Sequence, residues 1–176
     1  MNKDGKVFLR LLTYDDITEE YLTWFKDPQV TKYLEVDGEN LTKKMAQEYI
    51  ERGKKNNEYY MYAICLKDSN KHIGNLKIGP INWKHNFSDL VIVIGDKECW
   101  GKGLASEAIK KGIEIAFNTF NIRKLSGGIY SENVSSVKAY TNAGYFIEGK
   151  LKKQFIKNKS FQDKIMIGCF NPKFKK

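Results

Sequence analysis

One stretch decides the fold of this chain: Leu90-Val91-Ile92-Val93-Ile94-Gly95-Asp96-Lys97-Glu98-Cys99-Trp100-Gly101-Lys102-Gly103-Leu104-Ala105-Ser106. The five apolar residues from Leu90 show no polar alternation, and their β-branched content favours a strand that is buried on both faces. The residues that follow are apolar at helical spacing, which predicts an amphipathic helix with the inward stripe Ala105, Ala108, Ile109, Gly112, Ile113, Ala116, Phe117 and Phe120. A buried strand therefore leads through a glycine loop into a helix.

The glycine loop has the properties of a phosphate-binding site. Gly101 and Gly103 lack a Cβ, so the backbone can turn sharply and approach a ligand closely. The helix that follows presents unpaired N–H groups and the positive end of its dipole, which favours a phosphate or pyrophosphate. Neither common nucleotide loop fits, because Gly103 replaces the Ser or Thr of a Walker loop and Ser106 replaces the third glycine of a Rossmann fingerprint.

Length and charge limit the class of protein. A chain of 176 residues predicts a single domain over residues 1–176 that can bury a proper core. The net charge of +9, from 30 Lys and Arg against 21 Asp and Glu, favours anionic ligands. Because the lysines are scattered rather than clustered, no nucleic-acid partner is expected.

The cysteines and the apolar runs bear on the compartment. Cys65, Cys99 and Cys169 are isolated thiols without metal or disulfide spacing, which suits a reducing cytoplasm and predicts no metal. The first six residues do not have the pattern of a signal peptide, and no apolar run is long enough to span a membrane. We therefore expect a cytoplasmic protein without a membrane partner, and a homodimer is compatible with the sequence.

Periodicity and turn residues predict strand, two helices, three strands, helix, strand, helix and two strands. The expected strands span residues 7–12, 59–66, 72–78, 90–94, 124–130, 145–157 and 161–170. The expected helices span residues 13–25, 42–54, 105–120 and 133–143. In the second helix Met45, Tyr49 and Ile50 are expected to face inward, and Gly79-Pro80 is expected to end a strand. This order predicts an α+β fold with a mixed sheet.

The loop from Trp100 to Ala105 resembles the acyl-CoA pyrophosphate loop of the GNAT superfamily of N-acetyltransferases, whose pattern is Gln/Arg-x-x-Gly-x-Gly/Ala between a strand and a helix. Glu98 replaces the Gln or Arg, a departure also common in the ribosomal-protein-alanine-acetyltransferase-like branch. The element order is the full GNAT order, so the resemblance covers nearly the whole chain. It implies a mixed, mostly antiparallel seven-stranded sheet with four helices (β-α-α-β-β-β-α-β-α-β-β), acetyl-CoA as cosubstrate and no metal.

A second stretch, from Asn133 to Tyr145, resembles the GNAT signature Asn-x-x-Ser-x-x-x-Tyr-x-x-x-Gly-Phe. Asn133, Ser136 and Tyr140 share one helix face. The resemblance implies that Asn133 orders the pantetheine end and that the Tyr140 hydroxyl lies beside the thioester sulfur. A tyrosine with a pKa of ~10 can protonate a departing thiolate, whose own pKa is ~8.5. The alternative is that Asn133 only caps the helix and Tyr140 only packs.

The family also implies that the central strand pairs with pantetheine through its backbone. The residues expected to contact acetyl-CoA are Ile92, Val93, Ile94, Trp100, Gly101, Lys102, Gly103, Leu104, Ala105, Ser106, Asn133, Ser136 and Tyr140. Asp89 stands where relatives that acetylate protein N-termini carry a Glu, and it is the candidate base beside Tyr140. The alternative for Asp89 is a solvated carboxylate at the start of a strand.

The acceptor is predicted from the stretch between Tyr21 and Leu34. It resembles the Tyr-x-x-Trp-x-Asn-Asp-Pro-x-Val-x-x-Tyr-Leu stretch of GNAT enzymes associated with bacterial surface-sugar synthesis, with Lys26 in place of Asn. A nucleotide-linked amino sugar is the preferred acceptor, and a polyamine of the spermidine type or a ribosomal-protein N-terminus is the alternative. A catalytically silent CoA-binding sensor is the alternative from another class. The residues expected at the acceptor are Trp24, Tyr33, Glu35, Trp83 and His85.

Overall fold

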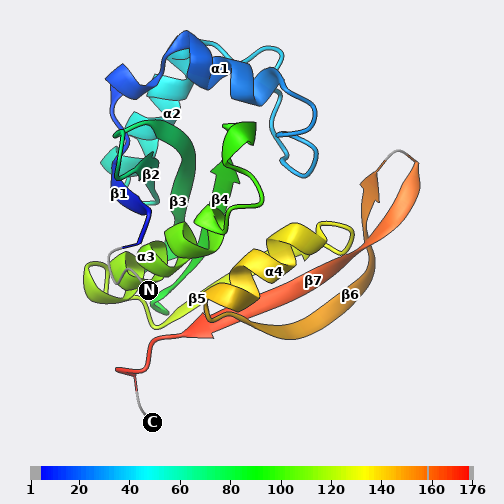
Figure 1. The fold of residues 1–176 in the computed structure, drawn as a ribbon. Coiled ribbons are helices and arrows are strands. Elements are labelled where there is room, and N and C mark those ends of the chain that lie inside the picture. The colour runs from blue at the N-terminus through cyan, green and yellow to red at the C-terminus, as the bar shows by residue number, and fades with distance from the viewer. Residues whose placement is uncertain (1–4, 158, 175–176) are drawn as a thin grey trace.

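The computed structural model describes residues 5–157 and 159–174, which fold around one seven-stranded sheet (Figure 1). Its strands are β1 (Val7–Leu11), β2 (Tyr60–Leu66), β3 (His72–Asn82), β4 (Phe87–Ile94), β5 (Lys124–Tyr130), β6 (Phe146–Lys157) and β7 (Ser160–Phe170). Its helices are α1 (Glu19–Lys26), α2 (Lys43–Lys55), α3 (Leu104–Asn118) and α4 (Val134–Ala143), with short 3-10 turns η1 (Tyr14–Asp16) and η2 (Lys97–Cys99). The predicted α+β fold and element order are confirmed.

The sheet divides between β4 and β5. Its strand order is β1-β2-β3-β4-β5-β7-β6, and among the described strands only β4 and β5 pair in parallel. That pairing covers Phe87–Asp89 against Lys124–Ser126 and then stops, whereas β3 stays paired with β4 as far as Ile94. Figure 1 shows the consequence, because β3 and β4 extend toward the top of the view whereas β6 and β7 extend toward its right-hand side. The rest of β4 therefore has a free edge that faces a gap.

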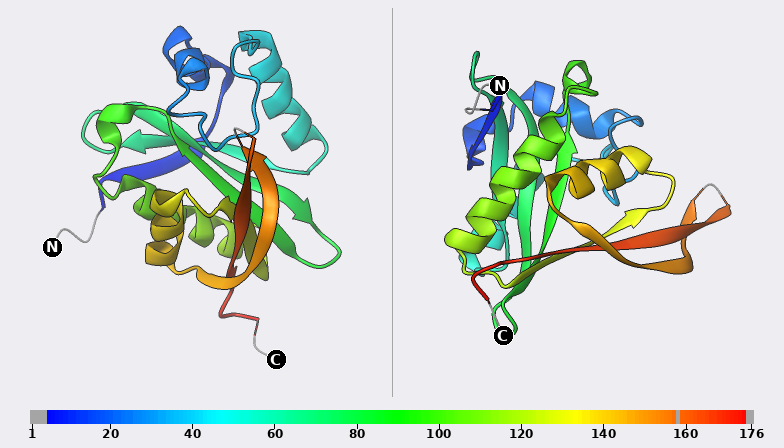
Figure 2. Two further views of the ribbon diagram at one scale, coloured as in Figure 1. Left: turned by 90° about the vertical axis from the view of Figure 1, so that its right-hand side faces the viewer. Right: turned by 60° about the horizontal axis from the view of Figure 1, so that its bottom comes forward.

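The helices cover opposite faces of the sheet. Apolar side chains of α3 and α4 pack with Leu76, Leu90 and Leu125 in the larger core cluster. Side chains of α1 and α2 pack with Ala63 and Cys65 of β2 in a second cluster. The two helix pairs lie on either side of the sheet in Figure 2. We call these the α3/α4 face and the α1/α2 face.

The two N-terminal helices differ from the prediction. The first begins at Glu19 rather than near Thr13, because the Asp16 carboxylate accepts the Thr13 amide and ends a separate turn, η1. A new N-cap, Thr18, then starts α1. In α2 the small residues Ala46 and Gly53 are buried, whereas Met45 and Tyr49 are exposed and, of the three residues predicted to face inward, Ile50 packs against the second cluster. The inward face is thus rotated from the predicted one and brings the α2 backbone close to the sheet.

The central strands also differ from the prediction. β3 does not end at Gly79-Pro80 but continues to Asn82 through a register shift. β4 begins earlier, at Phe87, and it is not buried on both faces, since Val91 is 42% exposed. The exposure follows from the gap, because β5 no longer flanks this part of β4. The predicted turn at 158–160 includes Asn158, which lies outside the described residues.

Candidate active site

The free edge of β4 presents alternate backbone groups to the gap. The Leu90 carbonyl accepts the Tyr140 hydroxyl at 2.8 Å, and the Ile94 carbonyl accepts the Trp100 indole N–H at 2.9 Å. Because backbone groups alternate between the two edges of an antiparallel strand, those of Ile92 point the same way. The Val93 carbonyl lies on the opposite edge, where a Cβ added to Gly74 would collide with it. The backbone groups of Ile92 and Ile94 thus point into the gap, whereas those of Val93 point toward β3.

Tyr140 projects from α4 to the apex of this gap, by which we mean the point after Asp89 where β4 and β5 cease to pair. Its side chain is buried, and its hydroxyl reaches the β4 backbone at the first residue beyond the β4–β5 pairing. Burial raises the pKa of this hydroxyl, the charge of Asp89 raises it further, and a hydrogen bond from the Ile92 amide opposes both. The hydroxyl therefore stays protonated at physiological pH and can act as a proton donor.

Asp89 lies at the same apex on the other face. It is the last β4 residue paired with β5, and its Oδ1 accepts the hydroxyl of its pairing partner Ser126 at 2.6 Å. Leu90 packs on the α3/α4 face, so the alternation of a strand places Asp89 on the α1/α2 face. The carboxylate is half-buried and hydrogen-bonded rather than freely solvated. A carboxylate and a tyrosine hydroxyl therefore meet the apex from opposite faces.

The glycine loop lies at the far end of β4 from the β3–β4 turn. Gly101 and Gly103 have φ of 73° and 78°, the left-handed region that glycine adopts without strain. A Cβ at either position would meet nothing within 4 Å, so the loop surface is open. Gly103 is the N-cap of α3, and the amides of Leu104, Ala105 and Ser106 form its first turn. The exposed Lys102 adds a positive charge to the same loop.

At the start of α4, Asn133 acts as a helix cap, the simpler of the two roles considered for it. Its side-chain oxygen accepts the Ser136 amide at 3.2 Å and caps the helix. Next to Tyr140, the Tyr145 ring lies edge-on with the ring centroids 5.0 Å apart. The Tyr145 hydroxyl is buried without a hydrogen-bond partner among the described residues. Sequence reasoning missed this hydroxyl, and the signal was a Tyr where the family signature has Phe.

An aromatic cluster closes the α1/α2 face beyond Asp89. Tyr33 and Tyr130 lie with ring centroids 5.6 Å apart, and Tyr130 stacks on Phe155 at 4.0 Å. The Tyr130 hydroxyl donates to Glu35 at 3.5 Å. The structure therefore brings the predicted residues Tyr33 and Glu35 together. It adds Tyr130 and Phe155, which sequence reasoning missed because they come from β5 and β6.

The other three predicted acceptor residues lie elsewhere. Trp24 is 6% exposed, packs against Gly95 and lies edge-on to the His72 ring at 5.0 Å, so α1 presents it to the core. Trp83 and His85 occupy the β3–β4 turn, at the paired end of β4. The Trp83 indole there donates to the Asn57 carbonyl at 2.7 Å. None of the three joins the aromatic cluster.

The comparison with protein families agrees with this geometry. A model described as an acetyltransferase (GNAT) domain matches residues 6–145, most of the chain. This chain belongs to the GNAT acetyltransferase family. It is 25% identical over 153 residues to the uncharacterized N-acetyltransferase p20 of Bacillus licheniformis, with 84% of this chain and 83% of the relative covered. It is 29% identical over 101 residues to the spermidine N(1)-acetyltransferase of Escherichia coli, a match that covers 57% of this chain and 54% of that enzyme.

Solved GNAT structures share the fold. The spermidine N-acetyltransferase of Vibrio cholerae, in complex with CoA and spermine, has a TM-score of 0.83 and 21% identity over 94% of this chain and 95% of that one. The ribosomal-protein-S5-alanine acetyltransferase of Vibrio fischeri has a TM-score of 0.82 and 19% identity over 99% and 98%. The chain is therefore a GNAT N-acetyltransferase by family and by fold.

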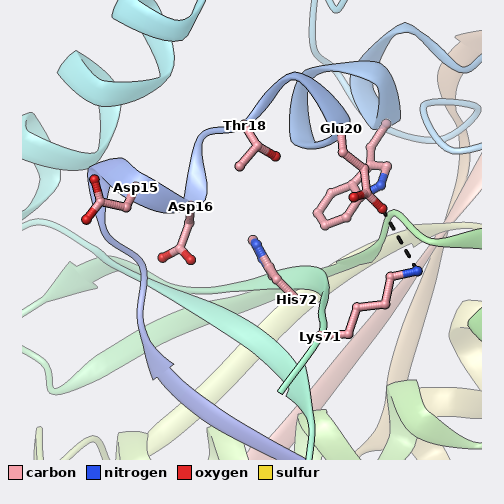
Figure 3. A pocket seen from close by; sticks show the side chains of 7 residues that line it. Asp15, Asp16, Thr18, Glu20, Lys71 and His72 are labelled. Atoms are coloured by element: carbon pink, nitrogen blue, oxygen red, sulfur yellow. Dashed lines mark ion pairs between the residues drawn. The ribbon is translucent and has the colours of Figure 1, made fainter. Parts of the chain in front are cut away.

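Two cavities of this GNAT chain lie apart from the apex. They have volumes of about 160 and 310 Å³ and both border Glu20 and Trp24 of α1. Figure 3 shows the smaller one, whose lining includes the acidic residues Asp15, Asp16 and Glu20. Lys71 pairs with Asp96 at 2.7 Å and lies 3.9 Å from Glu20, so it balances part of this acidic lining. Neither cavity is lined by the loop glycines, Tyr140 or Asp89.

Within residues 5–157 and 159–174, no group of three or more His, Cys, Asp or Glu side chains is arranged to hold a metal ion. No helix in the same part of the chain is long and apolar enough to cross a membrane. The three cysteines are buried free thiols.

Replacing Gly103 with Ala is expected to weaken acetyl-CoA binding about tenfold. The Cβ meets no protein atom within 4 Å, but it occupies the surface that the helix N-terminus offers to a pyrophosphate. Isothermal titration calorimetry measures this affinity. Gly144→Ala is the matched control, because Gly144 also has a positive φ and open space around its Cβ. If the two variants bind acetyl-CoA with equal affinity, the glycine loop is not part of the acetyl-CoA site.

Proposed function

We propose that this GNAT N-acetyltransferase transfers the acetyl group of acetyl-CoA directly to a primary amine of a small acceptor. The observation that carries the proposal is the meeting of the Tyr140 hydroxyl and the Asp89 carboxylate at the apex of the gap. The amine nitrogen attacks the thioester carbonyl, and its proton passes to Asp89. The C–S bond then breaks and the thiolate takes the proton of the Tyr140 hydroxyl; the Tyr140 oxygen is reprotonated as Asp89 gives up the amine proton, which restores both side chains. No covalent enzyme intermediate is needed.

The residues of the gap and loop suit acetyl-CoA. The first-turn amides of α3 favour a pyrophosphate, and the open surface at Gly101 and Gly103 lets it approach. The free edge of β4 offers the Ile92 backbone to the amide groups of a pantetheine arm, as an added strand would pair. CoA bound to the Vibrio cholerae relative supports the same cosubstrate here.

For the acceptor, a nucleotide-linked amino sugar remains our first candidate. It rests on the Tyr21–Leu34 stretch and on a net charge of +9, which favours an anionic acceptor. A polyamine is the second candidate, because relatives named for spermidine match this chain in sequence and in fold. A ribosomal-protein N-terminus is the third, supported by the Vibrio fischeri structure.

A thiol-release assay with acetyl-CoA tests the proposal. The acceptor panel contains amino-sugar nucleotides, spermidine, aminoglycosides and ribosomal-protein N-terminal peptides. We expect amine-dependent release of CoA thiol together with the acetylated amine in mass spectra. Binding of acetyl-CoA without turnover of any amine would favour a CoA-binding sensor instead. Turnover of spermidine or a ribosomal peptide, with none of the amino-sugar nucleotides, would exclude the sugar as acceptor.

A further inference from the structure

Lys164 of β7 is a half-buried cation that the proposed reaction does not use. Among the described residues its ammonium makes no ion pair. Lysines nearby on the same sheet do pair, Lys124 with Glu148 at 2.6 Å and Lys150 with Asp163 at 2.7 Å. The Lys164 ammonium instead lies 5.6 Å from the centroid of the Phe155 ring, and a cation without an opposite charge beside it gains from an anionic ligand.

Gly128 of β5 provides the space for this lysine. A Cβ on Gly128 would collide with Cε of Lys164 and lie 2.8 Å from its Nζ. The backbone of Gly128 is not in the left-handed region, so the conformation alone does not require glycine. Glycine weakens the interior of a strand and often marks the close approach of another group. Here the approaching group is the Lys164 side chain.

The strand register places Lys164 on the acceptor side of the apex. Ser126, Gly128 and Tyr130 are every second residue of β5 and so lie on one face of the sheet, the face that Ser126 shares with Asp89. Two residues of strand separate Ser126 from Gly128 by about 7 Å. Lys164 pairs with Tyr130 across the β5–β7 ladder, so its side chain lies on this face too. The ammonium therefore lies between the Asp89 carboxylate and the aromatic cluster.

A second cation lies at the outer end of the same face. The Lys157 ammonium lies 3.7 Å from the centroid of the Tyr33 ring and donates to the Lys32 carbonyl at 2.5 Å. Burial lowers the pKa of Lys157 and the charge of Lys32 lowers it further, while the charge of Glu132 opposes both. The α1/α2 face thus carries the Asp89 carboxylate at the apex, the Lys164 ammonium beyond it, and at the outer end the Lys157 ammonium together with the Glu35 carboxylate on the Tyr130 hydroxyl.

We propose that Lys164 binds an anionic group of the acceptor, a carboxylate or a phosphate, while the acceptor amine lies at Asp89. This inference rests on the proposed function and adds a residue that determines its specificity. An acceptor with an amine and an anionic group matches the Asp89 carboxylate and the Lys164 ammonium. A polycation such as spermidine instead brings a second positive charge toward Lys164, which repels it.

Two pairs of amines test the inference and distinguish the two anions. Glucosamine 6-phosphate against glucosamine tests phosphate, and β-alanine against β-alaninamide tests carboxylate. With the wild-type protein we expect a KM about tenfold lower for the charged member of at least one pair, the size of one charged hydrogen bond. Lys164→Gln is expected to remove this preference without changing KM for the neutral member, and Lys164→Arg is expected to keep it.

Lys150→Gln is the matched control. It removes one charge from the opposite face of the same hairpin and is expected to leave the preference unchanged. Thermal melting of each variant confirms that it is folded. Any of three results would overturn the inference. The first is equal KM values within both pairs, and the second is a preference for spermidine over both anionic amines. The third is that Lys150→Gln loses the preference for the charged amine as fully as Lys164→Gln does.

Calorimetry separates this inference from the proposed function. The charged amines are titrated into wild-type protein and Lys164→Gln, both saturated with CoA. Lys164-dependent binding without acetylation of any amine would reject the acetyl transfer and retain the anion site. Acetylation without a Lys164-dependent preference would retain the transfer and reject the anion site. If neither charged amine binds, the anion site is also rejected.

Discussion

Tyr140→Phe is expected to lower kcat by roughly 10²–10⁴-fold, the range for loss of a general acid. The hydroxyl lies on the Leu90 carbonyl at the apex, where a departing thiolate would need a proton. Burial raises the pKa of this hydroxyl, so it holds its proton across the working pH range. The affinity for acetyl-CoA should change little, because the ring remains. Steady-state thiol release gives kcat, and calorimetry gives the affinity.

Tyr145→Phe is the control for Tyr140→Phe. Both rings are buried and lie edge-on to each other, but the Tyr145 hydroxyl has no hydrogen-bond partner in the described part of the chain. Its removal should leave kcat within a few-fold of the wild type. Loss of the Tyr140 hydrogen bond should cost about 1–3 kcal/mol of unfolding free energy. Near-normal kcat in Tyr140→Phe would assign the proton to water or another donor.

The fold was predictable because its local signals agree. A β-branched run, two glycines before an amphipathic helix, and Gly144 after the last helix each allow few structures. The free edge of β4 was not predictable in the same way. Periodicity describes which residues are apolar, so the run from Leu90 to Ile94 indicated burial. Its exposure depends on β5 parting from β4 after Asp89, which is a property of strand pairing.

In the candidate site, too, single residues were predictable from the sequence, but their arrangement in space was not. Tyr140 and Asp89 were predicted individually from motif positions, but their meeting at one apex depends on the three-residue parallel pairing. Lys164 and Phe155 belong to no sequence motif. They lie in the β6–β7 hairpin, and their place at the site depends on how this hairpin pairs with β5. Trp24 shows the opposite case, because an aromatic residue in a recognisable stretch was assigned to the acceptor and packs in the core.

Asp89→Asn is expected to lower kcat/KM for the acceptor about 10²-fold at pH 7, the size of a lost general base. An alkyl amine like that of lysine has a pKa of ~10.4, so at pH 7 nearly all of it is the ammonium, which cannot attack. Asp89 can hold this ammonium and receive its proton. As pH rises, free amine becomes abundant and needs this help less, so the defect should shrink toward pH 10. Thiol release at saturating acetyl-CoA, measured at each pH from 7 to 10, follows this change.

Ser126→Ala and Asp37→Asn separate the proton role from other effects. Ser126→Ala keeps the Asp89 carboxylate and removes only the 2.6 Å hydrogen bond that orients it, so its loss should stay below tenfold and change little with pH. Asp37→Asn removes an exposed carboxylate of the α1–α2 loop and should leave the profile unchanged. A defect of the same size at every pH in Asp89→Asn would make Asp89 a structural residue. In that case the amine would have to reach the apex already deprotonated, and the wild-type rate would itself rise with the fraction of free amine.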